Sequence, residues 1–141
     1  MTRKLAPPSG WPPPVEARRP SGETIDLLSL AREICRRYRA EYPDEQQRYG
    51  DAGVAWCVHD NQHIVQWAVL AADGTLDLNA QLGWLAGVLE ARDFPLDRLA
   101  RDLELAAEAV RETVAGGTEI ARRLDGGAAF VRSTGSFLTA G

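Results

Sequence analysis

The sequence predicts an all-α protein: an up-down four-helix bundle with a disordered, proline-rich N-terminal arm and a loose, glycine-rich C-terminal tail. Three observations support this class. Apolar residues recur with helical spacing over four long stretches, and turn residues separate these stretches after short intervals. β-Branched residues are few and do not alternate with polar ones, so strand content should be near zero. We expect the arm over residues 1–23, the bundle over 24–116, and a short helix with a flexible tail over 117–141.

The composition is typical of a globular protein with one core, since 45% of the 141 residues are apolar and 26% are charged. The formal net charge of -4 argues against nucleic acid as a main partner. No apolar run approaches the ~18 residues that a membrane span requires, and the N-terminus shows no hydrophobic signal core. We therefore expect a cytoplasmic protein that does not act at a membrane.

The N-terminal arm is defined by its prolines, which favour an extended, polyproline-like backbone. Six prolines lie within the first 20 residues: Pro7, Pro8, Pro12, Pro13, Pro14 and Pro20. One interpretation is a disordered leader. The other is an arm that docks on a partner with Trp11 as its anchor.

The first two helices are delimited by capping and breaking residues. We expect the first over about 27–42, with Asp26 as its N-cap. Pro43 ends that helix, because the residue before a proline avoids the helical region, and it also opens the next helix. That next helix is expected to be short, because Gly50 interrupts it, and the second main helix then runs to about residue 72.

The third helix is expected over about 78–92 with Asp77 as N-cap, and the fourth over about 95–114. Gly83 and Gly87 lie one turn apart on the third helix and suggest close approach of another backbone, with chance as the alternative. The fourth helix carries apolar residues in steps of three and four, a regular bundle seam: Leu96, Leu99, Leu103, Ala106 and Val110.

After the fourth helix, Thr118 is a candidate cap for a short helix over 119–124. Gly126 and Gly127 then predict the end of regular structure, since glycine disfavours helix interiors. We expect the last several residues to be loose, although Phe130 and Phe137 could fold back onto the bundle.

Five consecutive polar residues interrupt the apolar pattern of the second helix: His59, Asp60, Asn61, Gln62 and His63. At 100° per residue, Asp60 and Asn61 fall within the apolar arc. A buried amide or carboxylate without a partner costs about a few kcal/mol. Each of the two should therefore have a specific partner.

A metal site is one hypothesis for this turn. His59 and His63, at i and i+4, can both reach one ion, and Asp60 lies between them. A third ligand would have to come from another helix, with Glu90 and Asp77 as candidates. No other cofactor is predicted. The alternative is a pair of histidines that only make hydrogen bonds within the bundle, with Asp60 orienting the His63 imidazole.

A ligand held between helices is a second hypothesis. Its lining would be Trp56, His63, Trp67 and Trp84. In the alternative, the tryptophans are plain core and their indole N–H groups are satisfied by Asp60 or Gln66.

Nucleophilic catalysis finds little support in the sequence. Cys57 points about 160° away from His59 on the helical wheel and cannot pair with it. Cys35 and Cys57 both lie on apolar helical faces, so in a cytosolic chain we expect free, buried thiols. No glycine-rich phosphate loop or nucleophile elbow is present, and an enzyme is therefore not the favoured class.

Residues 59–114 resemble the helical domain that precedes the cobalamin-binding domain in bacterial sensory and regulatory proteins. The similar segments are His59–Trp67, Leu82–Arg92, Phe94-Pro95-Leu96 and Leu99–Leu105. In that family the domain covers a ligand domain or relays its state, so the resemblance implies a helical fold and a sensory or scaffolding role. The chain after residue 114 is too short for a cobalamin-binding domain, and no cofactor residues are carried over.

These observations together predict a small, non-catalytic, cytoplasmic helical-bundle protein of regulatory character that acts through a protein partner or through self-association. The alternative is a bundle that binds a metal ion or small ligand at His59, Asp60 and His63.

Overall fold

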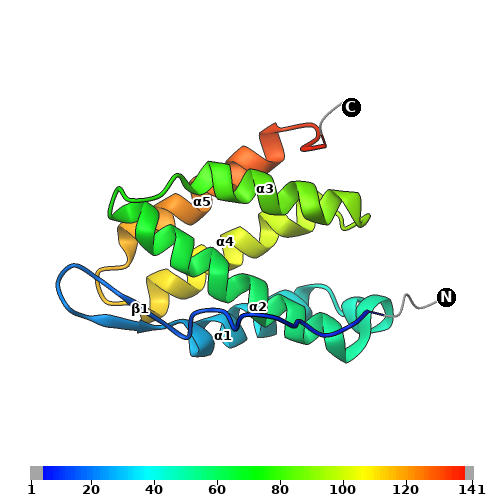
Figure 1. Cartoon of the computed structure of the whole chain (residues 1–141), viewed down its shortest axis with the longest axis horizontal. Coiled ribbons are helices and arrows are strands. Elements are labelled where there is room, and N and C mark those ends of the chain that lie inside the picture. The colour runs from blue at the N-terminus through cyan, green and yellow to red at the C-terminus, as the bar shows by residue number, and fades with distance from the viewer. Residues whose placement is uncertain (1–4, 139–141) are drawn as a thin grey trace. The chain divides into compact units, whose positions relative to one another are not determined.

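The computed structural model describes residues 5–138 and confirms a mostly helical protein (Figure 1). Within that range the chain forms two short strands and five helices. In chain order these are β1 (Glu16–Arg18), β2 (Thr24–Asp26), α1 (Leu27–Glu41), α2 (Glu45–Ala72), α3 (Leu78–Ala91), α4 (Leu96–Thr113) and α5 (Thr118–Ser133).

The chain divides into two compact units, and the division falls within α2. The N-terminal unit, Met1–Gln66, contains the two strands, α1 and most of α2. The C-terminal unit, Trp67–Gly141, contains the end of α2 and the helices α3, α4 and α5.

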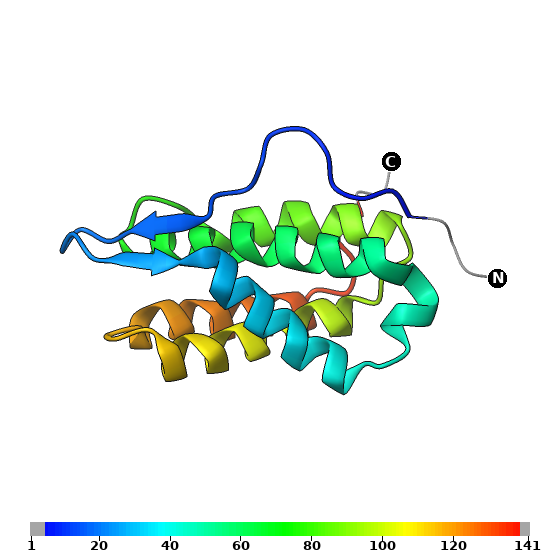
Figure 2. The same cartoon turned by 90° about the horizontal axis from the view of Figure 1, so that it is seen from below.

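The two strands form an antiparallel hairpin, which corrects the expectation of almost no strand (Figure 2). Ala17 lies opposite Ile25, and both are buried, whereas their strand neighbours are exposed. The connecting turn uses Gly22, at φ 94°, a region that favours glycine. The hairpin escaped prediction because each strand has three residues and only one inward-facing side chain. Alternation cannot be recognised over so short a run.

The helix α1 begins where the sequence predicts, because Asp26 caps it. The Asp26 carboxylate accepts hydrogen bonds from the Ser29 backbone N–H at 2.9 Å and from the Ser29 hydroxyl at 2.8 Å. The interruption of α2 at Gly50 is also confirmed, with φ 66° and ψ -159°. The Arg39 guanidinium of α1 donates to Gln46 Oε1 at 3.0 Å and to the Gly50 carbonyl at 3.4 Å. These bonds join α1 to the first turns of α2.

In the C-terminal unit α3, α4 and α5 pack against one another, most extensively α4 against α5, which run side by side (Figure 2). Asp77 caps α3 by accepting from the Ala80 N–H at 3.1 Å, as predicted. The seam of α4 is buried at Leu99, Leu103, Ala106 and Val110. Opposite it, α5 buries Ile120, Ala121, Leu124, Ala128 and Val131.

The extent of α5 corrects the prediction of a short helix ending near residue 124. The helix runs through Gly126 and Gly127 to Ser133, and its N-cap is Gly117 rather than Thr118. A Cβ added at Gly127 would lie 2.5 Å from Leu82 Cδ1. The glycine is therefore needed for close packing of α5 on α3, and this tertiary contact overrides its poor helix propensity.

The segment after α5 folds back onto α3, so the predicted loose tail is not confirmed for residues 134–138. The Glu90 carboxylate accepts from the Ser136 hydroxyl at 2.6 Å and from the Phe137 N–H at 2.7 Å. A Cβ added at Gly87 would lie 3.4 Å from the Phe137 carbonyl oxygen. The predicted approach of another backbone is thus present at Gly87, whereas at Gly83 an added Cβ would meet only the Phe137 ring, 3.9 Å away. Residues 139–141 lie outside the described range.

Candidate functional site

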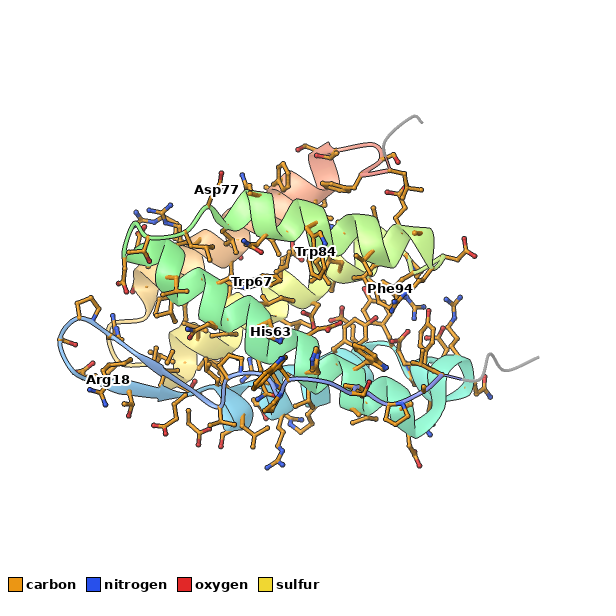
Figure 3. The ribbon with its side chains drawn as sticks, viewed as in Figure 1. Arg18, His63, Trp67, Asp77, Trp84 and Phe94 are labelled. Carbon is orange, nitrogen blue, oxygen red and sulfur yellow. A yellow bond between two sulfur atoms is a disulfide. The ribbon has the colours of Figure 1, made fainter. Side chains whose placement is uncertain are left out.

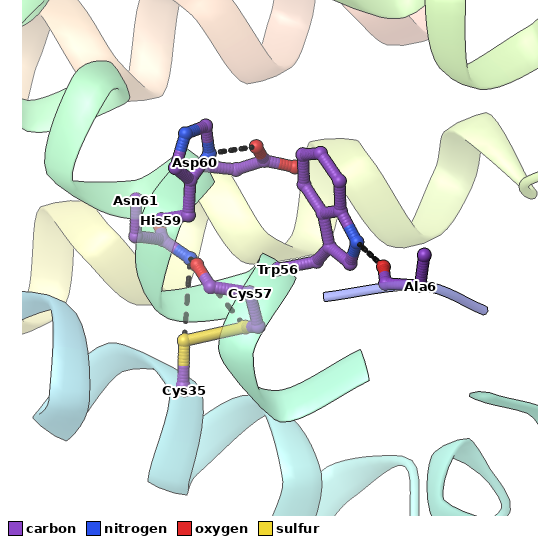
Figure 4. A network of polar contacts seen from close by, with 7 residues as sticks. All are labelled: Ala6, Cys35, Trp56, Cys57, His59, Asp60 and Asn61. Carbon is purple, nitrogen blue, oxygen red and sulfur yellow. Dashed lines mark hydrogen bonds and ion pairs between the residues drawn. A yellow bond between two sulfur atoms is a disulfide. The ribbon is translucent and has the colours of Figure 1, made fainter. Parts of the chain in front are cut away.

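The polar turn of α2 holds the N-terminal arm in place. The Trp56 indole N–H donates to the Ala6 carbonyl at 2.6 Å (Figure 4). Gln62 Nε2 donates to the Pro14 carbonyl at 3.0 Å. The arm then enters the hairpin, where the Val15 carbonyl accepts from the Leu27 N–H at 2.9 Å. We call residues 5–15 the docked arm. The disorder predicted for this stretch is not confirmed, and residues 1–4 lie outside the described range.

Trp11 lies in the docked arm between these attachment points and projects into solvent. Its side chain is 94% exposed, and Val15 is 54% exposed. The docked arm, Leu5 to Val15, contains no charged residue. It therefore presents a rigid apolar side chain on a backbone that is attached on both sides of it.

Cys35 of α1 and Cys57 of α2 form a disulfide, with their Cα atoms 6.0 Å apart (Figure 4). The expectation of free buried thiols is therefore wrong. The two cysteines do lie on the apolar faces predicted for them. Helical spacing identifies such faces, but it does not show that two of them meet at the cysteines.

Asn61 is 2% exposed and lies next to this disulfide. Its Nδ2 donates to the Cys57 carbonyl at 3.0 Å and lies 3.6 Å from the sulfur of each cysteine (Figure 4). The predicted burial of Asn61 is confirmed, and this contact set is the specific partner that burial requires.

Gln62, another member of the polar run, is also buried, because the docked arm covers it. Its side chain is 4% exposed and donates to the Pro14 carbonyl. The sequence signal for this role is weak, since a polar residue beside a polar turn ordinarily faces water.

The two histidines lie side by side, with ring centroids 4.9 Å apart in an edge-on arrangement. His59 Nδ1 and Asp60 Oδ1 are 3.1 Å apart, so Asp60 pairs with His59, whereas the sequence suggested His63. Burial lowers the pKa of His63, and the neighbouring His59 charge lowers it further, while Asp60 opposes both effects. The lowered pKa favours the neutral form of the His63 imidazole, which can accept a hydrogen bond.

The predicted metal ligands do not come together as a set. Within residues 5–138 no group of three or more His, Cys, Asp or Glu side chains is placed to hold one metal ion. The two proposed third ligands have other partners: Asp77 caps α3, and Glu90 binds the chain at Ser136 and Phe137.

The four residues predicted to line a ligand site are divided between the units. Trp56 and His63 belong to the N-terminal unit, and Trp67 and Trp84 to the C-terminal unit. His63, Trp67 and Trp84 are labelled in Figure 3. Trp84 is 64% exposed, so it is not a core residue. The Trp56 indole is satisfied by the arm carbonyl of Ala6, not by the expected side chains.

Comparison with models of known protein families, with curated proteins and with solved structures finds no match to this chain. Over the part of the chain that the structure describes, no helix is both long enough and apolar enough to cross a membrane.

Proposed function

We propose that this chain is a non-catalytic protein that binds a protein partner through its docked arm, with Trp11 as the anchor. The observation that carries the proposal is the 94% exposure of Trp11 between backbone carbonyls that are tied to the body of the N-terminal unit. Tryptophan is among the residues most enriched at binding hot spots. A single exposed indole needs no explanation by itself, but the backbone that carries Trp11 is hydrogen-bonded to α2 on both sides of it.

The energetics favour binding over simple exposure. A tryptophan buries about 150–250 Å², which at roughly 25 cal/mol per Å² corresponds to about 4–6 kcal/mol of favourable transfer. Much of that gain is usually lost to ordering a flexible segment. The prolines of the docked arm and its hydrogen bonds to Trp56 and Gln62 already remove part of this freedom.

The chemistry of the docked arm indicates the kind of partner. The sequence Gly10-Trp11-Pro12-Pro13-Pro14 has no charge and a restricted, extended backbone. Grooves lined with aromatic side chains recognise such segments. The partner surface is therefore an apolar, aromatic-lined groove, carried by another protein or by a second copy of this chain.

A photo-crosslinking experiment tests the proposal. A photoreactive residue replaces the exposed Ser9, and the protein is irradiated in its native host. We expect an adduct of one discrete mass that is lost with Trp11→Ala and retained with Trp84→Ala, which removes the other highly exposed tryptophan. An adduct of twice the 15.4 kDa chain mass identifies self-association. Equal adduct yields from all three proteins would overturn the proposal.

The alternative function, a metal or small ligand at His59, Asp60 and His63, is supported by the adjacency of the two imidazole rings. Elemental analysis and an absorbance scan of untagged protein test it. A stoichiometric metal or chromophore that is lost in His59→Ala and His63→Ala supports this alternative. If the wild-type protein contains neither, the alternative is refuted.

We also propose an up-down four-helix arrangement, a cytoplasmic location, and a bacterial regulatory or sensory role. The last is supported by the resemblance of residues 59–114 to the helical domains that precede cobalamin-binding domains.

A further inference from the structure

The two sulfurs of the disulfide differ in access. Cys35 is 2% exposed, whereas Cys57 is partly exposed on α2. Thiol–disulfide exchange requires in-line approach of an external thiolate to one sulfur. Of the two cysteines, Cys57 is therefore the one more open to such an attack.

The group beside the sulfurs is a hydrogen-bond donor. Asn61 Nδ2 lies 3.6 Å from Cys35 Sγ and 3.6 Å from Cys57 Sγ, and the bond to the Cys57 carbonyl fixes its position. A disulfide sulfur is a weak acceptor and gains little from this donor. A thiolate is charged, and a donor to a charged group contributes roughly twice as much as a neutral one. The donor therefore favours the reduced, ionised form over the disulfide.

We propose that Cys35–Cys57 is a thiol–disulfide exchange site that takes electrons from a dithiol reductant. The reductant thiolate attacks Cys57 Sγ, the Cys35–Cys57 bond breaks, and the electron pair of that bond leaves on Cys35 Sγ. Asn61 Nδ2 stabilises this buried thiolate. The second thiol of the reductant then attacks the mixed disulfide and releases Cys57. In sum the reductant becomes a disulfide, and two electrons and two protons pass to the cysteine pair.

The site fits the proposed cytoplasmic location. Cytosolic disulfides are commonly transient, and they are catalytic or redox-sensing. Cys35 and Cys57 are 22 residues apart in sequence, and reduction of their disulfide removes the covalent link between α1 and α2. The protein partner of the exchange is therefore a dithiol redox protein, and this inference does not depend on partner binding by Trp11.

A pair of single-cysteine variants tests the asymmetry. Folded Cys35→Ala and Cys57→Ala proteins are each incubated with glutathione disulfide, and the mixed disulfide is followed by intact mass. We expect Cys57, in the Cys35→Ala protein, to react at least about tenfold faster than Cys35 in the other variant, because access governs the attack. Equal rates, or faster reaction at Cys35, would overturn the proposal.

The role of Asn61 is tested on the otherwise wild-type chain. The disulfide is reduced with dithiothreitol under native conditions, and released thiols are alkylated and counted by mass. Asn61→Leu is expected to slow reduction about tenfold, the value of one hydrogen bond to a charged group. Gln62→Leu is the matched control, since it removes the neighbouring buried amide and its single bond to Pro14. A disulfide that resists reduction until the protein unfolds, or equal slowing by both variants, contradicts the assignment. If Asn61→Leu does not fold, the reaction rates of the two single-cysteine variants alone test the proposed exchange site.

Discussion

Replacing Gly127 with alanine tests the packing of α5 on α3. The new Cβ would lie 2.5 Å from Leu82 Cδ1, well inside the ~3.5–4.0 Å optimum for carbon atoms. Leu82 is fully buried, so its methyl group has little room to move. Overpacking of this kind costs about 1–3 kcal/mol, while alanine regains about 1 kcal/mol of helix propensity. We expect a net loss of about 0–2 kcal/mol in the free energy of unfolding.

Gly126→Ala is the matched control, because a Cβ at that position meets nothing within 4 Å. It should stabilise the protein by about 1 kcal/mol through propensity alone. Urea unfolding at pH 7, followed by circular dichroism, measures both variants. If the two adjacent substitutions stabilise equally, α5 is not packed on α3 at Gly127 and the reasoning is refuted.

A double variant localises the clash. Leu82→Ala alone should cost about 2–5 kcal/mol, as truncation of a buried leucine does. It also removes the methyl group that the Gly127 Cβ would strike. The double variant should therefore be more stable than the sum of the single changes predicts, with a coupling of about 0.5–3 kcal/mol. If the two changes in the free energy of unfolding add strictly, the cost of Gly127→Ala does not come from a clash with Leu82.

Three further predictions concern the chain ends and the histidines. Hydrogen bonds from Ser136 and then Phe137 lower the pKa of Glu90. The contact between Glu90 and the segment after α5 is therefore complete above the pKa of Glu90 in the unfolded chain, and it is lost as pH falls through the lowered pKa of the folded protein. The NMR chemical shift of the Phe137 amide should follow this titration, and Glu90→Gln should abolish it. The lowered pKa of His63 has the same sign, so its NMR titration should fall below 6.5, and a midpoint above 6.5 contradicts the burial. Trp56→Phe removes one hydrogen bond to the arm, worth about 0.5–1.5 kcal/mol, and should raise proteolysis of residues 5–15 up to about tenfold without unfolding the helices.

Helix boundaries were predictable because their causes are local. Asp26 and Asp77 each accept from an N–H three residues ahead, so the cap and the group it satisfies lie in one short window of sequence. Gly50 likewise adopts the positive φ expected of an interruption, at 66°.

The C-terminal helix was not predictable from local rules. Two consecutive glycines indicate a helix end, yet Gly127 is retained within α5 because a larger residue would strike Leu82. The contact joins residues 45 positions apart, and a propensity scale contains no such information. The fold-back at Glu90 is similar, since its partner Phe137 follows 47 residues later.

Burial within the polar turn of α2 was predictable from the sequence, but the partners of the buried groups were not. The polar turn of α2 does hold buried groups that need specific partners, as Asn61 shows. Those partners are an arm carbonyl 48 residues away for Gln62 and a disulfide between Cys35 and Cys57. A helical wheel identifies which side chains are buried, but not which distant segment covers them.

Backbone order in the docked arm is the most direct test of the account, since display of Trp11 depends on it. Nitrogen-15 relaxation at the amides of Ser9, Gly10 and Trp11 gives the order parameter of each. Attachment through Trp56 and Gln62 predicts values approaching the ~0.85 of rigid backbone. Values below about 0.6, typical of a flexible chain, would show that the arm is not held on α2 and would contradict the account.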